Sequence, residues 1–98
     1  MNNRTNGRLP LFSLGQVVST PGALEAVAEA DESFEQLLRR HVSGDWGVLC
    51  VEDQQENARA LANGWRILSA YVLSTGVKIW VITEADRSVT TILLPSEY

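Results

Sequence analysis

Cysteine and histidine are almost missing from this chain, which has one of each, Cys50 and His41, among 98 residues. A single cysteine excludes an internal disulfide and any metal site built from several cysteines. Zinc sites in proteins combine several nitrogen and sulfur ligands, and this chain offers one histidine and one thiol. We therefore expect neither a metal site nor a bound cofactor.

Long apolar runs are missing as well. No run approaches the roughly 18 to 20 residues that a helix needs to span a bilayer. The first ten residues, MNNRTNGRLP, contain two arginines without the apolar stretch or small-residue cleavage site of a secretory signal. We interpret residues 1–10 as a flexible leader and residues 11–98 as one domain, which we expect in the cytoplasm and away from membranes.

Basic residues are few, and their distribution is uneven. Eight lysines and arginines stand against twelve acids, which gives a net charge of −4. Residues 22–56 hold nine acids and two arginines, or −7, whereas the rest of the chain holds three acids and six bases, or +3. This balance disfavours direct binding to nucleic acid or to anionic membrane. Two interpretations stay open: solvated acidic helix faces, or an acidic surface that docks onto a basic groove of another protein.

Hydrophobic periodicity divides the domain into an N-terminal strand, three helices and three further strands. Thr20 before Pro21 marks the start of a helix, and Ser33 with Gln36 forms the capping-box pattern at the start of a second. Gly64 ends the third helix, after which the period becomes that of a strand. The expected elements are a strand within 11–19, helices over 21–30, 34–42 and 51–63, and strands over 65–73, 77–83 and 89–94.

The order of these elements predicts an α+β domain, in which three helices pack on one face of an antiparallel sheet of three or four strands. The loops at 74–76 and 84–88 are short enough for antiparallel hairpins. The third helix has the thinnest apolar stripe and should be the most exposed. The strand at 89–94 carries no charge, so as an open edge it would let two copies pair as a homodimer.

The hairpin loop at 84–88 holds the densest group of reactive side chains. A small ribonuclease of the barnase and colicin type needs a base, an acid and a cation on the phosphate. Glu84 could be the base, Arg87 the phosphate clamp and His41 the acid, although such an enzyme wants a basic cleft. In the alternative reading, Asp86 hydrogen-bonds its own backbone, Arg87 pairs with Glu84 or Asp86, and His41 is a partly buried structural residue on the second helix.

A tryptophan in a turn suggests a contact surface for another protein. Trp46 lies between two glycines, Gly44 and Gly47, and exposed tryptophan is enriched at binding hot spots. The acids of the middle segment could surround it. The candidate partner-binding residues are Glu25, Glu29, Glu35, Asp45, Trp46, Glu52, Asp53 and Glu56.

Four stretches carry a resemblance: Leu14 to Ala26, GDWG at 44–47, LSAY at 68–71, and IWVITEADRSVTTILLP at 79–95 with the ending Glu97-Tyr98. In these, over nearly the whole domain, the chain resembles a family of small bacterial proteins associated with plasmids and other mobile elements, some of them labelled as restriction-enzyme subunits. Members tend to have an acidic residue near the position where this chain has Cys50. This difference argues against an essential role for the thiol.

The resemblance implies a role in the biology of mobile DNA. Together with the acidic middle segment, it leads us to expect a non-enzymatic protein-binding module whose partner is a nucleic-acid-binding complex of host defence. Such a protein would be an anti-CRISPR or anti-restriction inhibitor that acts through an acidic surface. The ribonuclease or toxin built on His41, Glu84 and Arg87 stays the alternative.

Overall fold

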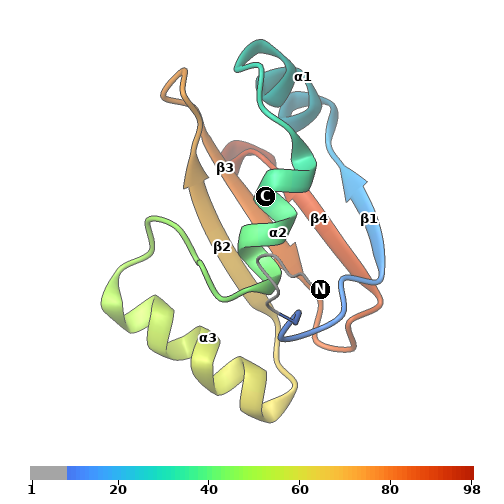
Figure 1. Cartoon of the computed structure of the whole chain (residues 1–98), viewed down its shortest axis with the longest axis vertical. Coiled ribbons are helices and arrows are strands. Elements are labelled where there is room, and N and C mark those ends of the chain that lie inside the picture. Colours follow the sequence, from blue (N-terminus) through green and yellow to red (C-terminus); the bar gives the residue numbers. More distant parts are fainter. Residues whose placement is uncertain (1–8) are drawn as a thin grey trace, which may run out of the picture.

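The computed structural model describes residues 9–98, which form a four-stranded sheet with helices packed against it (Figure 1). The elements in chain order are β1 (Gln16–Ser19), α1 (Pro21–Glu29), α2 (Phe34–Val42), α3 (Val51–Asn63), β2 (Ile67–Val72), β3 (Lys78–Thr83), β4 (Val89–Leu93) and the 3-10 helix η1 (Pro95–Glu97). The α+β class is confirmed, as are the three helices and the three C-terminal strands. Within the described range, no helix has both the length and the apolar character needed to cross a membrane.

The strands follow one another across the sheet in the order β1-β4-β3-β2. β2, β3 and β4 form the predicted antiparallel meander. β1 is the fourth strand, and it runs parallel to β4, with Gln16 opposite Val89 and Ser19 opposite Ile92. The sheet is therefore mixed rather than wholly antiparallel. The long crossover through the three helices and the meander lets β1 and β4 run in the same direction.

β4 lies inside the sheet, between β1 and β3. The expectation that residues 89–94 form an open edge is therefore wrong, and the edges are β1 and β2. The N-terminal strand is also shorter than expected, because the chain bends at Gly15, where φ is 64°. A Cβ at Gly15 would lie 2.3 Å from the Ser88 carbonyl oxygen, so only glycine lets the chain approach β4 so closely here.

The helix boundaries come from local capping chemistry. The Thr20 hydroxyl accepts from Ala23 N at 3.2 Å, and the Ser33 hydroxyl accepts from Gln36 N at 3.2 Å. Each satisfies a backbone donor that the first turn of the helix leaves unpaired. Gly64 ends α3 in the left-handed conformation with φ of 71°.

The core lies between one face of the sheet and helices α1 and α2. It consists of Ala23, Ala26, Val27, Ala30, Leu37, Tyr71, Leu73, Ile79, Val81 and Ile92. α3 lies beside β2 (Figure 1) and buries only Asn57 and Ala60, so it is the most exposed helix, as predicted. The apolar stripes differ in detail from simple periodicity: on α1 Leu24 is 57% exposed, because the first turn directs Ala23 inward instead.

Candidate functional site

His41 is the centre of a buried chain of polar side chains. From α2 its ring reaches two strands: Nδ1 is 2.6 Å from Ser69 Oγ on β2, and Nε2 is 2.9 Å from Thr83 Oγ1 on β3. Thr83 Oγ1 is 2.7 Å from Thr90 Oγ1 on β4, and the Thr90 hydroxyl donates to the Leu14 carbonyl at 2.8 Å. The exposed fraction is 0% for His41, Ser69, Thr83 and Thr90, so this series of hydrogen-bonded side chains has no contact with solvent.

The protons along this chain have one consistent arrangement. Thr90 has a single hydroxyl proton and gives it to Leu14, so its oxygen accepts from Thr83. The oxygen of Thr83 then accepts from Nε2–H of His41, and Nδ1, unprotonated in the neutral ring, accepts from Ser69. Each buried polar group thus has a partner, which ties α2 to three strands at little cost in desolvation.

Burial keeps His41 neutral. The ring meets Phe12 edge-on at 5.1 Å between centroids and Trp46 at 6.1 Å, so its surroundings are aromatic and apolar as well as hydroxylic. Desolvation lowers the pKa of His41 to about 4, because the charged form would lose its hydration. A neutral, enclosed imidazole at ordinary pH holds the fold together; in this conformation it has no solvent-facing side from which to protonate a leaving group.

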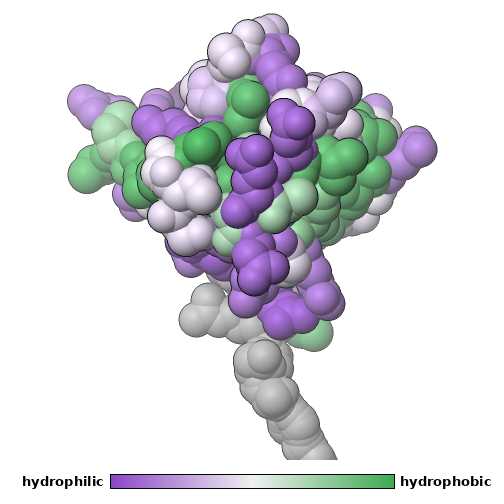
Figure 2. Space-filling view, turned by 90° about the horizontal axis from the view of Figure 1, so that it is seen from above, coloured by the Kyte–Doolittle hydropathy of each residue, from purple (hydrophilic) through white to green (hydrophobic). Residues whose placement is uncertain are grey.

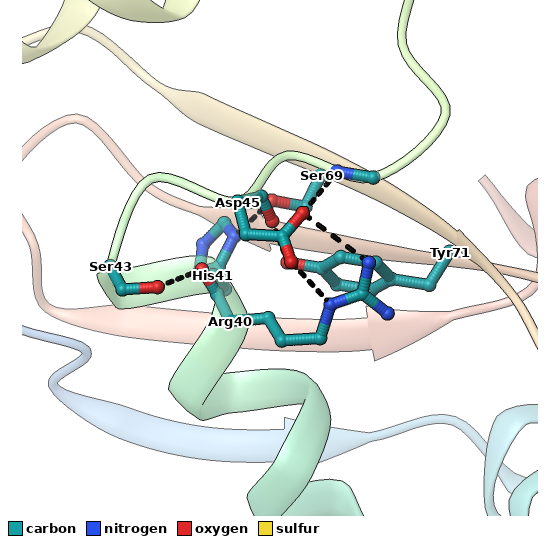
Figure 3. A network of polar contacts seen from close by, with 7 residues as sticks. Arg40, His41, Ser43, Asp45, Ser69 and Tyr71 are labelled. Carbon is teal, nitrogen blue, oxygen red and sulfur yellow. Dashed lines mark hydrogen bonds and ion pairs between the residues drawn. The ribbon is translucent and has the colours of Figure 1, made fainter. Parts of the chain in front are cut away.

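Arg40, the neighbour of His41 on α2, clamps the loop that follows the helix (Figure 3). Its Nε donates to Asp45 Oδ2 at 2.7 Å and its Nη2 to Oδ1 at 3.3 Å, and its guanidinium lies 4.4 Å from the Tyr71 ring centroid. The Tyr71 hydroxyl donates to the Asp45 carbonyl at 2.7 Å. These bonds to Arg40 lower the pKa of Asp45, and burial raises the pKa of Tyr71 to about 12, so Asp45 stays ionised and Tyr71 neutral.

The loop at 84–88 is held by its own side chains. Arg87 has a positive φ of 61° and turns its guanidinium inward. Its Nη1 donates to the carbonyls of Trp65 at 2.7 Å, Glu84 at 3.2 Å and Ala85 at 3.2 Å, and its Nη2 donates to Ala60 at 3.3 Å. The guanidinium therefore fastens the β3–β4 hairpin to the C-terminal end of α3.

The predicted turn chemistry is right for Asp86 and wrong for Arg87. Asp86 Oδ1 accepts from Ser88 N at 3.0 Å, as a self-bonded turn requires. Arg87 pairs with no carboxylate among the described residues; its guanidinium donates to backbone carbonyls of the loop, of α3 and of Trp65 instead. Arg87 and His41 each contact the Phe12 ring, at 5.6 and 5.1 Å, so they reach the same end of the sheet with an aromatic ring between them.

The candidate partner-binding acids are spread over three helices and one loop. All seven acids are exposed. Three of them form salt bridges with arginines: Glu35 with Arg39, Asp45 with Arg40, and Glu56 with Arg59. Figure 1 places α1, which carries Glu25 and Glu29, and α3, which carries Glu52 and Asp53, toward opposite ends of the molecule. The acids therefore form separate surfaces rather than one.

Trp46 and Cys50 differ in their surroundings. Trp46 is half-buried and packs its ring near Phe12, at 6.4 Å, and His41, which places it chiefly over the buried polar chain. Cys50 is exposed at the start of α3 and makes no side-chain capping bond there. In the range 9–98, no group of three or more histidine, cysteine, aspartate or glutamate side chains could hold a metal ion.

Sequence reasoning does not single out Ser69, although it is the hydrogen-bond donor to His41. The available signal is its place between Ile67 and Tyr71 on alternate positions of one strand, which makes it an inward-facing polar residue. Such a residue needs a buried partner. No family model, curated protein or solved structure matches this chain significantly.

Proposed function

We propose that this chain is a small acidic protein-binding module without catalytic activity, and that its binding surface is the start of α3 with the loop before it. One observation carries the proposal. Val51 is 67% exposed and directly precedes the exposed acids Glu52 and Asp53, and Val48, in the loop before α3, is 56% exposed. Within residues 9–98, neither acid forms a salt bridge. We call these four residues the α3 surface.

The α3 surface combines the two properties that a protein interface needs. Apolar side chains provide affinity when a partner covers them, and unpaired charges speed the encounter and select a partner of opposite sign. α3 is also the helix that contributes least to the core, since only Asn57 and Ala60 are buried. Its outer face is therefore free for an interaction.

The partner of this surface is a basic surface of another protein. Nucleic-acid-binding complexes carry such surfaces, because they neutralise phosphates with lysine and arginine. The resemblance to proteins of plasmids and mobile elements supports a complex of host defence, of CRISPR or restriction type, as the partner. In this proposal the acids of α3 stand in for nucleic-acid phosphates.

A charge-reversal pair tests the proposal. One variant carries Glu52→Lys and Asp53→Lys on α3, and the matched control carries Glu25→Lys and Glu29→Lys on α1, so that both change the net charge equally. Each purified protein is immobilised and exposed to a lysate of a host cell, and the captured proteins are identified by mass spectrometry. We expect a nucleic-acid-binding complex on the wild type and the α1 variant, and its loss from the α3 variant.

Two outcomes count against the proposal. Equal capture by both variants would mean that the α3 surface is not the contact. If the wild type captured no nucleic-acid-binding complex, the proposed class of partner would be wrong. Circular dichroism of each variant shows that loss of capture is not loss of fold. A growth defect on expression that Glu84→Gln abolishes, in a variant that circular dichroism shows to be folded, would instead support the ribonuclease or toxin.

A further inference from the structure

The two edge strands of the sheet, β2 and β1, differ in whether other groups of the protein bond to their outward backbone N–H and C=O groups. At β2, the Asn57 side chain covers the outward backbone of Leu68: its Nδ2 donates to the Leu68 carbonyl at 2.6 Å and its Oδ1 accepts from Leu68 N at 3.2 Å. Two residues on, the Ala70 carbonyl accepts from Val48 N at 2.7 Å, and Ala70 N donates to the Trp46 carbonyl at 3.0 Å. The β2 edge is thus closed against further strands.

The β1 edge has no such cover within residues 9–98. Gln16 N donates to the Ser88 carbonyl and Thr20 N to the Ile92 carbonyl, so Gln16 and Val18 direct their N–H and C=O groups toward β4, as does the N–H of Thr20. Because these directions alternate along a strand, Val17 and Ser19 direct their N–H and C=O groups away from the sheet. All four residues of β1 are exposed.

The stretch of chain that carries this edge has no charged side chain of its own, and the nearest carboxylate bonded to it, Glu97, accepts from Thr20 and Gly22 beyond the end of β1. No charged residue occurs between Leu9 and Leu24. Val17 and Val18 are 41% and 39% exposed. Figure 2 views the molecule from the end that carries α1, and apolar surface lies on its right-hand flank, the side of β1 in Figure 1. Proteins usually protect an open edge with lysine, proline or a bulge, and β1 has none of these.

We propose that the β1 edge pairs with the β1 edge of a second copy of this chain, antiparallel and about a two-fold axis at Val18. In this register Val17 faces Ser19 of the second copy and Ser19 faces its Val17. Both outward N–H groups and both outward carbonyls of each copy are then satisfied, and the two four-stranded sheets become one continuous sheet. The two Val18 side chains meet as a close pair, with Cα atoms about 4.5 Å apart.

The self-complementarity of the edge is the reason for choosing a second copy as its occupant. Each copy carries a net charge of −4, yet the pairing brings no charged residue of β1 opposite another, so like charges do not oppose it at the contact. The edge is four residues long, about 13 Å, which is far less than a standard interface. We therefore expect a weak dimer that forms as the concentration rises.

Complementary charges at Val18 test this pairing. Sedimentation equilibrium of the wild type from micromolar to millimolar concentration should show a mean mass that rises toward twice the monomer. Val18→Lys and Val18→Glu should each stay monomeric, because like charges meet at the two-fold axis, and an equal mixture of the two should associate again. Val72→Lys, on the half-exposed end of β2, is the control and should dimerise as the wild type does.

A cross-link tests the register directly. In a Cys50→Ser background, Val18→Cys should give a disulfide-linked dimer on mild oxidation, since Cα atoms of a close antiparallel pair lie within disulfide range. Val72→Cys in the same background should not. A wild type that stays monomeric at millimolar concentration overturns the proposal, and so does a mixture of the lysine and glutamate variants that fails to associate while circular dichroism shows both folded.

Discussion

Acidification from pH 7 to pH 5 should destabilise this protein through His41. It is the only histidine, and no other side chain ordinarily changes charge in this interval. In the fold the ring is enclosed, and its pKa is about 4, against 6.5 for a solvated histidine. The unfolded chain therefore binds more protons than the folded one between these two values, and protons favour unfolding.

The sign and the size follow from this difference. Because the folded pKa is depressed, the contribution of His41 is fully present above pH 6.5 and is lost as the pH falls toward 4. The whole difference corresponds to about 3 kcal/mol, of which about 2 kcal/mol is lost by pH 5. That is a large share of the roughly 5 to 10 kcal/mol that holds a domain of this size together.

The assay is urea unfolding followed by tryptophan fluorescence at pH 7 and at pH 5. For the wild type we expect the free energy of unfolding to be about 2 kcal/mol lower at pH 5, which moves the urea midpoint by roughly 0.7 to 2 M. His41→Gln removes the titrating group. This variant should be less stable than the wild type at pH 7, because the substitution breaks the bonds to Ser69 and Thr83. Its free energy of unfolding should, however, be nearly the same at pH 7 and at pH 5.

Two results would refute this reasoning. If His41→Gln lost as much stability between pH 7 and pH 5 as the wild type, another group would be responsible. If the His41 ring titrated near 6.5 in an NMR experiment on the folded protein, the imidazole would not be desolvated. The lowered pKa values of Asp45, Asp86 and Glu97 place their own effects at more acid pH, which is why the comparison stops at pH 5.

Two further predictions concern the ends of β1 and β4. Arg87→Lys keeps the charge but loses the planar guanidinium that reaches four carbonyls. We expect urea unfolding to show a free energy of unfolding about 1 to 2 kcal/mol lower than that of the wild type. A decrease too small to measure would contradict the role of Arg87 in fastening the hairpin to α3. Gly15→Ala places a Cβ 2.3 Å from the Ser88 carbonyl oxygen, whereas Gly64→Ala meets no atom within 4 Å. Thermal unfolding should therefore show a loss of about 1 kcal/mol for Gly64→Ala and a clearly larger loss for Gly15→Ala, and equal losses would mean that the approach of Gly15 to β4 does not need glycine.

Much of the fold is determined by local chemistry and can be predicted from the sequence. Thr20, Ser33 and Gly64 set helix ends through bonds to residues at most four positions away, so these caps can be read from local sequence; at α1 the distant Glu97 adds a bond from the Thr20 hydroxyl. The meander of β2, β3 and β4 follows in the same way from short loops between strand-like runs. The self-bonded turn at Asp86 is local as well.

The partners of the buried polar residues could not be predicted. The position of His41 on the apolar side of α2 follows from helical periodicity, but its bonds to Ser69 and Thr83 join residues 28 and 42 positions apart. They depend on the sheet register, in which a shift of one residue would turn Ser69 and Thr83 to the other face. Arg87 is a similar case, because two of the carbonyls that it reaches, those of Ala60 in α3 and of Trp65 between α3 and β2, lie 27 and 22 positions away in the chain.

By itself the sequence determined the class of the fold, the ends of the helices and the placement of His41 toward the core, because these depend on the spacing and chemistry of near neighbours. Only the tertiary structure decided that β1 joins the sheet parallel to β4, that β4 is thereby enclosed, and that β1 instead of β4 carries the open edge. The physical reason is that a strand's neighbours are selected by packing between distant parts of the chain, which periodicity along one strand does not encode.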